Sequence, residues 1–124
     1  MPSPRARNRW VPTCGSVTWS QTDHGGQEST ILALANTFYH WGAIVLPLGY
    51  TVHEVFAAGG NQYCASFTSG IRVGPPDPET MAVAVAQGRR LARVAQVIGL
   101  AQEQGLLDMR ACVVAPQDGP EAGH

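Results

Sequence analysis

The chain has 124 residues, of which 44% are hydrophobic, and its 8 basic and 9 acidic residues leave a formal net charge of −1. So small a net charge gives no broad electrostatic basis for binding nucleic acid or membranes, and we expect neither a nucleic-acid partner nor a membrane span. The 3 cysteines are widely spaced and form no Cys-x-x-Cys pair. This spacing argues against a disulfide framework or a zinc site and favours a reducing, cytoplasmic compartment.

Residues 1–14 differ in composition from the rest of the chain. They contain Arg5, Arg7 and Arg9 together with several prolines, and they show no apolar period. This composition predicts a disordered basic leader, and the missing apolar segment excludes a secretory signal. A transit peptide, a nucleic-acid-binding arm, and an altered start joined to a truncated domain are alternative interpretations of the same residues.

Residues 20–42 carry the clearest helical pattern. A loop ends at Gly25-Gly26, and Glu28 then falls in the first helical turn, where the helix dipole favours a carboxylate. Gly42 stands where a left-handed C-terminal cap is expected. The apolar residues of this segment follow the i, i+3, i+4, i+7 spacing of a helix with one buried face, at Ile31, Leu34, Ala35 and Phe38.

Two strands flank this predicted helix. The continuous apolar run AIVLPL from Ala43 to Leu48 suits a parallel strand covered on both faces, and residues 16–19 supply a preceding strand. Together they form a β-α-β unit, in which ligands bind at the carboxyl ends of the strands.

The remaining sequence predicts loops, one long helix and a tail. Residues 51–76 are rich in glycine and proline, and Asp77-Pro78 then gives an N-cap followed by proline at the first helical position. We expect Arg89, Arg90 and Arg93 to share a solvated face of this helix, with a contact to a partner or a phosphate as the alternative. Its predicted apolar stripe comprises Met81, Val85, Leu91, Val94, Ala95 and Ile98.

Four blocks of the chain, in order, resemble the flavodoxin-fold NAD(P)H:quinone oxidoreductases of the tryptophan-repressor-binding-protein type. They are HGGQEST at 24–30, His40, VLPLGY at 45–50 and AAGGNQY at 57–63. The resemblance covers roughly residues 15–98 and corresponds to the C-terminal half of that family's domain. It implies an α/β, partial flavodoxin-like doubly wound parallel sheet, in which this chain supplies strands four and five with their helices and a short strand near Ala65 to Thr68. We expect such a domain at 15–104, followed by a flexible C-terminal tail at 105–124.

The resemblance also implies a cofactor, substrates and a site. Family members use FMN and NAD(P)H to reduce quinones and assemble as tetramers, so a homo-oligomer or association with a full-length relative is expected here. Gln62 and Cys64 replace the proline and glycine of one family turn. The residues that match the family's flavin contacts are the loop residues Ser20, Gln21, Thr22, Asp23, His24 and Gly25, with His40 at the end of the helix.

One part of the family's flavin site has no counterpart in this sequence. The flavin phosphate of relatives sits in a Ser/Thr/Gly-rich loop at a helix N-terminus, after the first strand. We therefore expect an oxidoreductase-like flavoprotein that is truncated and catalytically inactive alone. The alternatives are a non-enzymatic fragment that docks on a full-length relative and a decayed gene product. From the residues alone, His40 has a second interpretation as a helix-terminal residue favoured by the dipole, and Glu28 as a helix-start residue.

Overall fold

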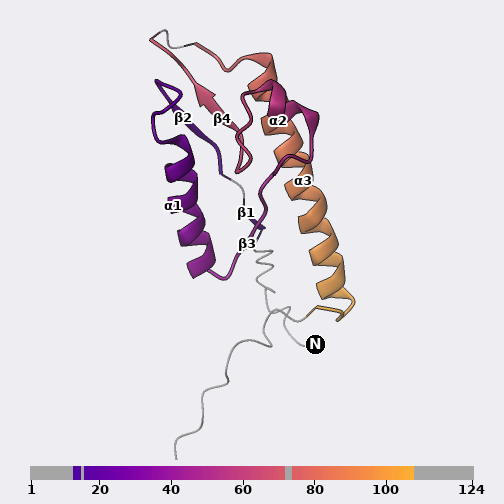
Figure 1. The fold of residues 1–124 in the computed structure, drawn as a ribbon. Helices are drawn as coiled ribbons and strands as arrows, with labels where there is room; N and C mark the ends of the chain where they lie inside the picture. Colours follow the sequence, from indigo (N-terminus) through magenta and orange to yellow (C-terminus); the bar gives the residue numbers. More distant parts are fainter. Residues whose placement is uncertain (1–12, 15, 72–73, 108–124) are drawn as a thin grey trace, which may run out of the picture.

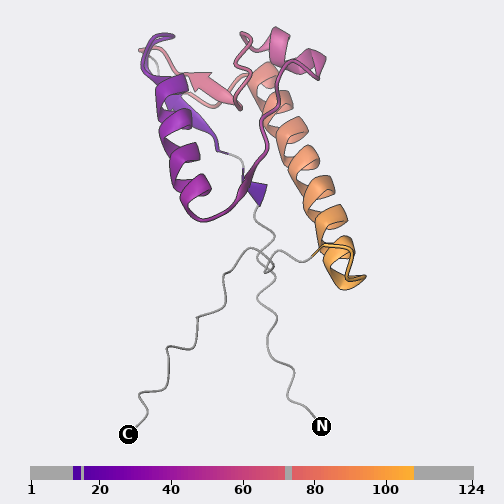
Figure 2. The ribbon, with the colours of Figure 1, turned by 60° about the horizontal axis from the view of Figure 1, so that its bottom comes forward.

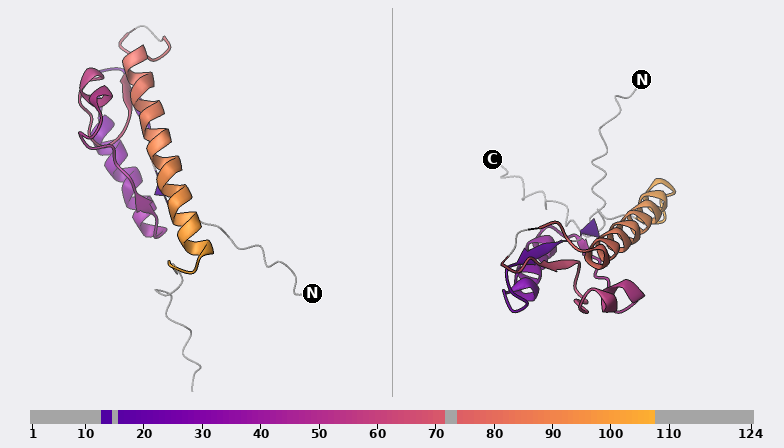
Figure 3. Two further views of the ribbon diagram at one scale, coloured as in Figure 1. Left: turned by 90° about the vertical axis from the view of Figure 1, so that its right-hand side faces the viewer. Right: turned by 90° about the horizontal axis from the view of Figure 1, so that it is seen from above.

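The computed structural model describes residues 13–14, 16–71 and 74–107. In chain order the elements are β1 Thr13–Cys14, β2 Thr18–Ser20, α1 Gln27–His40, β3 Ile44–Val45, α2 His53–Ala57, β4 Ser66–Thr68 and α3 Pro78–Glu103. The strands lie between α1 on one side and α3 on the other (Figures 1 and 3). The predicted fold class is confirmed: the chain is an α/β protein with a small parallel sheet and a partial flavodoxin-like arrangement.

The sheet consists of two short parallel ladders. β1 pairs with β3, with Thr13 opposite Ile44, and β2 pairs with β4, with Trp19 opposite Phe67. Residues 13–20 therefore meet two partner strands that are separated in sequence by residues 46–65, which we call the insertion. The predicted strand from Ala43 to Leu48 is in fact only Ile44–Val45, and the pairing resumes at Ser66.

The strand stops early for local reasons. Pro47 has no backbone N–H and cannot donate to a ladder. Gly49 then adopts a left-handed φ of 59°, and the Thr51 hydroxyl donates to the Leu48 carbonyl at 2.7 Å, so the chain turns away from the sheet. The short strand near Ala65 to Thr68, which the family resemblance implied, is present as β4.

The C-terminal end of α1 forms the predicted glycine cap. Gly42 has a φ of 70°, its N–H donates to the Tyr39 carbonyl at 3.0 Å, and the Ala43 N–H donates to the Phe38 carbonyl at 2.9 Å. This pair of bonds is a Schellman motif, which satisfies carbonyls at the helix end. The helix leads directly into β3 as a result.

The tightest packing lies between the insertion and α3. Leu48, Val55, Ala65 and Val83 form a cluster in which no member is more than 3% exposed. The short helix α2, which the glycine-rich sequence did not predict, supplies Val55 and lies beside the first turns of α3 (Figure 2). The insertion is therefore part of the core.

The helix α3 begins as predicted but presents a different face. Asp77 caps it by accepting from the Thr80 N–H at 2.7 Å, and Pro78 occupies the first turn. The predicted stripe is wrong at its start, because Met81 and Val85 are 48% and 46% exposed. The residues that face the core instead are Thr80, Val83 and Gln87, which are buried, followed by Leu91, Val94, Ala95 and Ile98, which are half-buried.

Because α3 presents a different face to the core from the predicted one, its three arginines do not share one solvated surface. Arg89 and Arg93 are exposed, as expected for a solvated face, but Arg90 is half-buried and its Nε is buried without a hydrogen-bond partner. Gln87 lies one turn before Leu91 and donates to the Ser16 carbonyl, just before β2, so this side of α3 faces the core.

The ordered elements start slightly earlier than the predicted domain. β1 occupies the last two residues of the predicted leader, because Thr13 and Cys14 continue the extended segment and pair with β3. The rest of the predicted leader (1–12) and most of the predicted tail (108–124) lie outside the described residues. No helix within the described ranges is long and apolar enough to cross a membrane.

Candidate functional site

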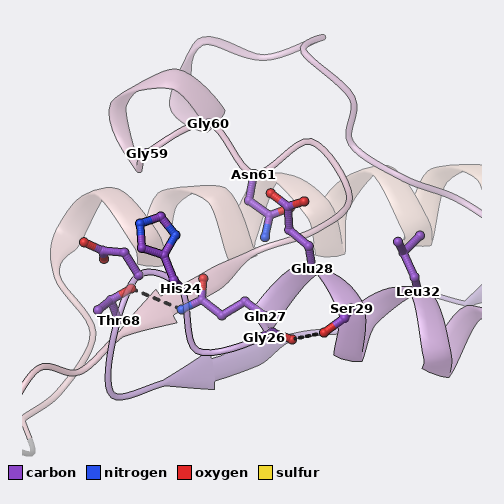
Figure 4. Close-up of a pocket in the computed structure, with 11 residues that line it drawn as sticks. His24, Gly26, Gln27, Glu28, Ser29, Leu32, Gly59, Gly60, Asn61 and Thr68 are labelled. Carbon is purple, nitrogen blue, oxygen red and sulfur yellow. Dashed lines mark hydrogen bonds between the residues drawn. The ribbon is translucent and has the colours of Figure 1, made fainter.

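A half-open cleft of about 830 Å³ lies at the N-terminal end of α1 (Figure 4). Its walls come from the loop before α1, from the first turns of α1, from the insertion and from β4. The lining residues are Asp23, His24, Gly26, Gln27, Glu28, Ser29, Leu32, Gly59, Gly60, Asn61 and Thr68. A cleft of this volume is in the range of small-molecule and cofactor sites.

The loop of residues 20–26 is held in shape by short contacts of its own. The Ser20 hydroxyl donates to the Thr22 carbonyl at 2.5 Å, and the Gly25 N–H donates to the same carbonyl at 3.0 Å. A Cβ on Gly25 would lie 2.4 Å from the Cβ of Ser20, so the close approach requires glycine. Gly26 adopts a φ of 82° at the N-cap of α1.

Gln27 ties the start of α1 to the far end of β4. Its Nε2 donates to the Phe67 carbonyl at 2.9 Å and to the Thr68 hydroxyl at 3.1 Å. The second of these bonds is drawn in Figure 4. Because Gln27 is half-buried, this contact fixes Thr68 in the wall of the cleft.

The insertion forms the opposite wall of the cleft. Gly59 and Gly60 have left-handed φ values of 93° and 82°, and a Cβ on either would meet nothing within 4 Å. Asn61 is anchored by donating to the Ser66 hydroxyl at 2.9 Å and by accepting from the Tyr63 N–H at 3.1 Å. This wall therefore offers backbone and one amide side chain, which suits a flat polar ligand.

The lining of the cleft carries acidic side chains. Asp23 and Glu28 contribute carboxylates to the lining, which contains no arginine or lysine. Glu28 points from α1 toward the segment that carries Gly59 and Gly60 (Figure 4). The described residues contain no group of three side chains that could hold a metal ion. Such a lining favours an uncharged ring over a phosphate group.

The structure separates the predicted site residues into three groups. Asp23 and His24 line the cleft, whereas Ser20, Gln21, Thr22 and Gly25 build the loop behind them. His40 is exposed at the opposite end of α1. A helix of 14 residues is about 21 Å long at 1.5 Å per residue, so His40 does not reach this cleft.

The residues of the insertion were not predicted as site residues. The block at 57–63 was part of the resemblance, but Gly59, Gly60 and Asn61 were not among the predicted site residues. The available signal was the glycine pair Gly59-Gly60 shortly before β4. Its position beside the loop before α1 can be inferred only once the pairing of β2 with β4 is known.

Comparison with curated proteins finds related sequences named NAD(P)H dehydrogenase (quinone). That of Deinococcus radiodurans is 46% identical over 57 residues, which is 46% of this chain and 28% of the relative. That of Methanosarcina barkeri is 37% identical over 99 residues (73% of this chain and 47% of the relative), and that of Sinorhizobium fredii is 38% identical over 96 residues (73% and 48%). No protein-family model matches the chain.

These relatives confirm the resemblance found in the sequence. The chain is homologous to NAD(P)H dehydrogenase (quinone) proteins over about 70% of its own length. It spans about half the length of the longer-matching relatives.

Proposed function

We propose that this chain carries the ring-binding part of an FMN site and belongs to an oxidoreductase that transfers electrons from NAD(P)H to a quinone. The observation that supports this most strongly is the cleft between the loop before α1 and the insertion. Both walls come from the sequence blocks that resemble the flavin enzymes, and the homologous proteins are named for that activity.

The described residues fit one part of FMN and not the other. The ring system is flat and uncharged at its hydrogen-bonding edge, and the cleft offers glycine backbone, Gln27 and Asn61. The phosphate group is anionic, and the lining offers Asp23 and Glu28 with no arginine or lysine. We therefore infer that the phosphate is held by residues outside the cleft, supplied by another chain or segment.

Bound FMN would supply two-electron transfer between nicotinamide and quinone. This chain would orient the ring through the backbone of Asp23 and His24, in the loop of residues 20–25, while the glycine wall at Gly59 and Gly60 admits it closely. His40 lies about one helix length away and would contact a flavin bound by another subunit of a homo-oligomer. The isolated chain is expected to show no quinone-dependent oxidation of NAD(P)H.

The test is a riboflavin titration of the chain followed by amide chemical shifts. Riboflavin carries the ring without the phosphate, so we expect changes in the amide chemical shifts of Gly59, Gly60 and Thr68. Ser29→Trp fills the cleft and should abolish these changes. Asn36→Trp, on an exposed position of the same helix outside the lining, should leave them intact. Shift changes spread elsewhere, or equal behaviour of the two variants, would overturn the proposal.

A second function is a non-enzymatic module that docks on a longer relative. It is favoured by the exposed side chains Val17 and Trp19, which lie beside a strand edge that no other described strand pairs with. Co-purification with such a relative in a flavin-free complex would support it over the first.

A further inference from the structure

The side of α3 opposite to Val83 and Gln87 carries an exposed row of apolar and basic side chains. Its members follow one another at helical spacing of four residues, and of three at the last step. We call this row the outer stripe, and it consists of Met81, Val85, Arg89, Arg93, Val97 and Leu100. The four apolar members are between 46% and 65% exposed. A helix face that meets only water carries polar and charged residues, so this row has the composition of a surface that another segment covers.

The positive charge of the outer stripe has no acidic neighbour on its own helix. Between Glu79 and Glu103, α3 contains three arginines and no aspartate or glutamate. Beside the stripe, Arg90 is half-buried, and its Nε is buried without a hydrogen-bond partner. Guanidinium groups match carboxylates in geometry as well as in charge. An occupant of this surface should therefore carry carboxylates next to apolar side chains.

The end of α3 turns the chain away from the helix axis. Gly105 has a φ of 70°, and its N–H donates to the Gln102 carbonyl at 3.2 Å. The Leu106 N–H donates to the Ala101 carbonyl at 2.8 Å, which completes a Schellman motif. Leu106 itself is 77% exposed. The apolar end of the outer stripe therefore lies close to the point from which the next residues start.

The sequence after this turn has the composition that the outer stripe requires. Residues 111–115 read ACVVA, and the two carboxylates of Asp118 and Glu121 follow. From its C-terminal end, the outer stripe presents its apolar residues first and its arginines second. The apolar run and the carboxylates come in the same order along the chain.

We propose that residues 111–121 of this chain dock on the outer stripe. In this arrangement the apolar run covers Val97 and Leu100, and the two carboxylates bind Arg93 and Arg89. Arg93 lies ten residues before the end of α3 at Glu103, about 15 Å at 1.5 Å per residue. Asp118 is 11 residues beyond Leu107, and an extended chain of this length spans up to about 35 Å. The carboxylates can therefore reach the arginines.

Zero-length cross-linking of the full 124-residue chain tests this contact. The chain contains no lysine, so Arg93→Lys introduces a single ε-amine on the outer stripe. A carbodiimide then joins this amine to a carboxylate that touches it, with loss of water, and mass spectrometry of the monomer identifies the joined peptides. We expect position 93 to be joined to Asp118 or Glu121. The yield should fall at 1 M salt, where the screening length is about 3 Å.

Asn36→Lys is the matched control, because it places an exposed amine on α1, on the other side of the strands (Figure 3). It should give no cross-link to Asp118 or Glu121. Equal yields from the two variants, or no cross-link at position 93 in a chain that is folded by circular dichroism, would overturn the proposal. Cross-links from position 93 that join two chains would show that a second copy is the occupant and would overturn it as well. The test uses no flavin, so its outcome is independent of the proposed function.

Discussion

The side chain of Gln87 in α3 donates to the backbone carbonyl of Ser16 at 2.9 Å, across 71 residues of sequence. Its Oε1 also accepts from the Ala65 N–H at 2.7 Å, so one amide joins the two segments where the ladder is interrupted. Gln87 is only 8% exposed. It replaces the hydrogen bonds that the missing strand pairing would have made at this point.

Replacing Gln87 with methionine should destabilise the fold. Methionine keeps the volume but removes both hydrogen bonds and leaves the buried Ala65 N–H unpaired, at a cost of about 1–3 kcal/mol. Chemical denaturation measures the change in the free energy of unfolding. Gln96→Met, on an exposed position of α3, is the control and should have little effect. Similar stability of the two variants would show that the bridge contributes nothing.

Two glycine-to-alanine substitutions should act in opposite directions. Gly25→Ala forces a Cβ to within 2.4 Å of the Ser20 Cβ and should lower stability and disturb the loop. Gly88→Ala, in the interior of α3 with open space around it, should raise stability by about 0.5–1 kcal/mol. Thermal unfolding of both variants checks the pair, and a stabilising Gly25→Ala would contradict the described loop.

The thiol of Cys64 should make stability depend on alkaline pH. Burial raises the pKa of Cys64 from its ordinary value of 9.0 to about 11, although a hydrogen bond with Ser16 opposes this. The unfolded chain therefore loses this proton at a lower pH than the folded chain. The stabilising contribution of the buried thiol to the free energy of unfolding is fully present below pH 9 and declines as pH rises from 9.0 to about 11.

Cys64→Ala provides the comparison for that prediction. Denaturation midpoints are measured from pH 8 to pH 11 for both chains, a range that begins below the ordinary pKa of 9.0 and ends at the raised pKa of about 11. The midpoint of the natural chain should fall more steeply than that of the variant. Parallel curves would mean that the thiol ionises equally well in the folded state.

The carboxylate of Asp77 should contribute to stability except in acid. The hydrogen bonds from the Thr80 backbone N–H and hydroxyl lower its pKa below the ordinary 3.8. The contribution is present above that ordinary value and is lost as pH falls through the lower pKa of the folded state. Asp77→Ala should lower the melting temperature at pH 7 and have a smaller effect in strong acid, whereas Asp77→Asn, which can still cap, should be milder. An equal loss at both pH values would contradict the capping role of the charge.

The sequence predicted the elements whose signals are local. The cap at Gly42, the start of α3 at Asp77-Pro78 and the exposed Gly25-Gly26 loop each depend on a few neighbouring residues, and all three are present. The β-α-β unit was also predictable from the sequence, because its helix and strands are adjacent along the chain.

The features that the sequence did not predict depend on distant pairing. The interruption of the strand at Val45 and the return at Ser66 require that residues 13–20 serve two partners, which no local pattern encodes. The contribution of Gly59 and Asn61 to the cleft follows from that return. The face of α3 was misassigned because a buried glutamine, which bonds to Ser16, lies where an apolar residue was expected.

The most direct test compares the affinity of the isolated chain for FMN and for riboflavin, with amide chemical shifts as the readout. The two ligands share the ring and differ in the phosphate group. In the proposed site the cleft binds the ring, and its lining carries Asp23 and Glu28 without arginine or lysine, so riboflavin should bind at least as tightly as FMN. FMN binding that is much tighter than riboflavin binding would show a phosphate site within this chain and would contradict the account.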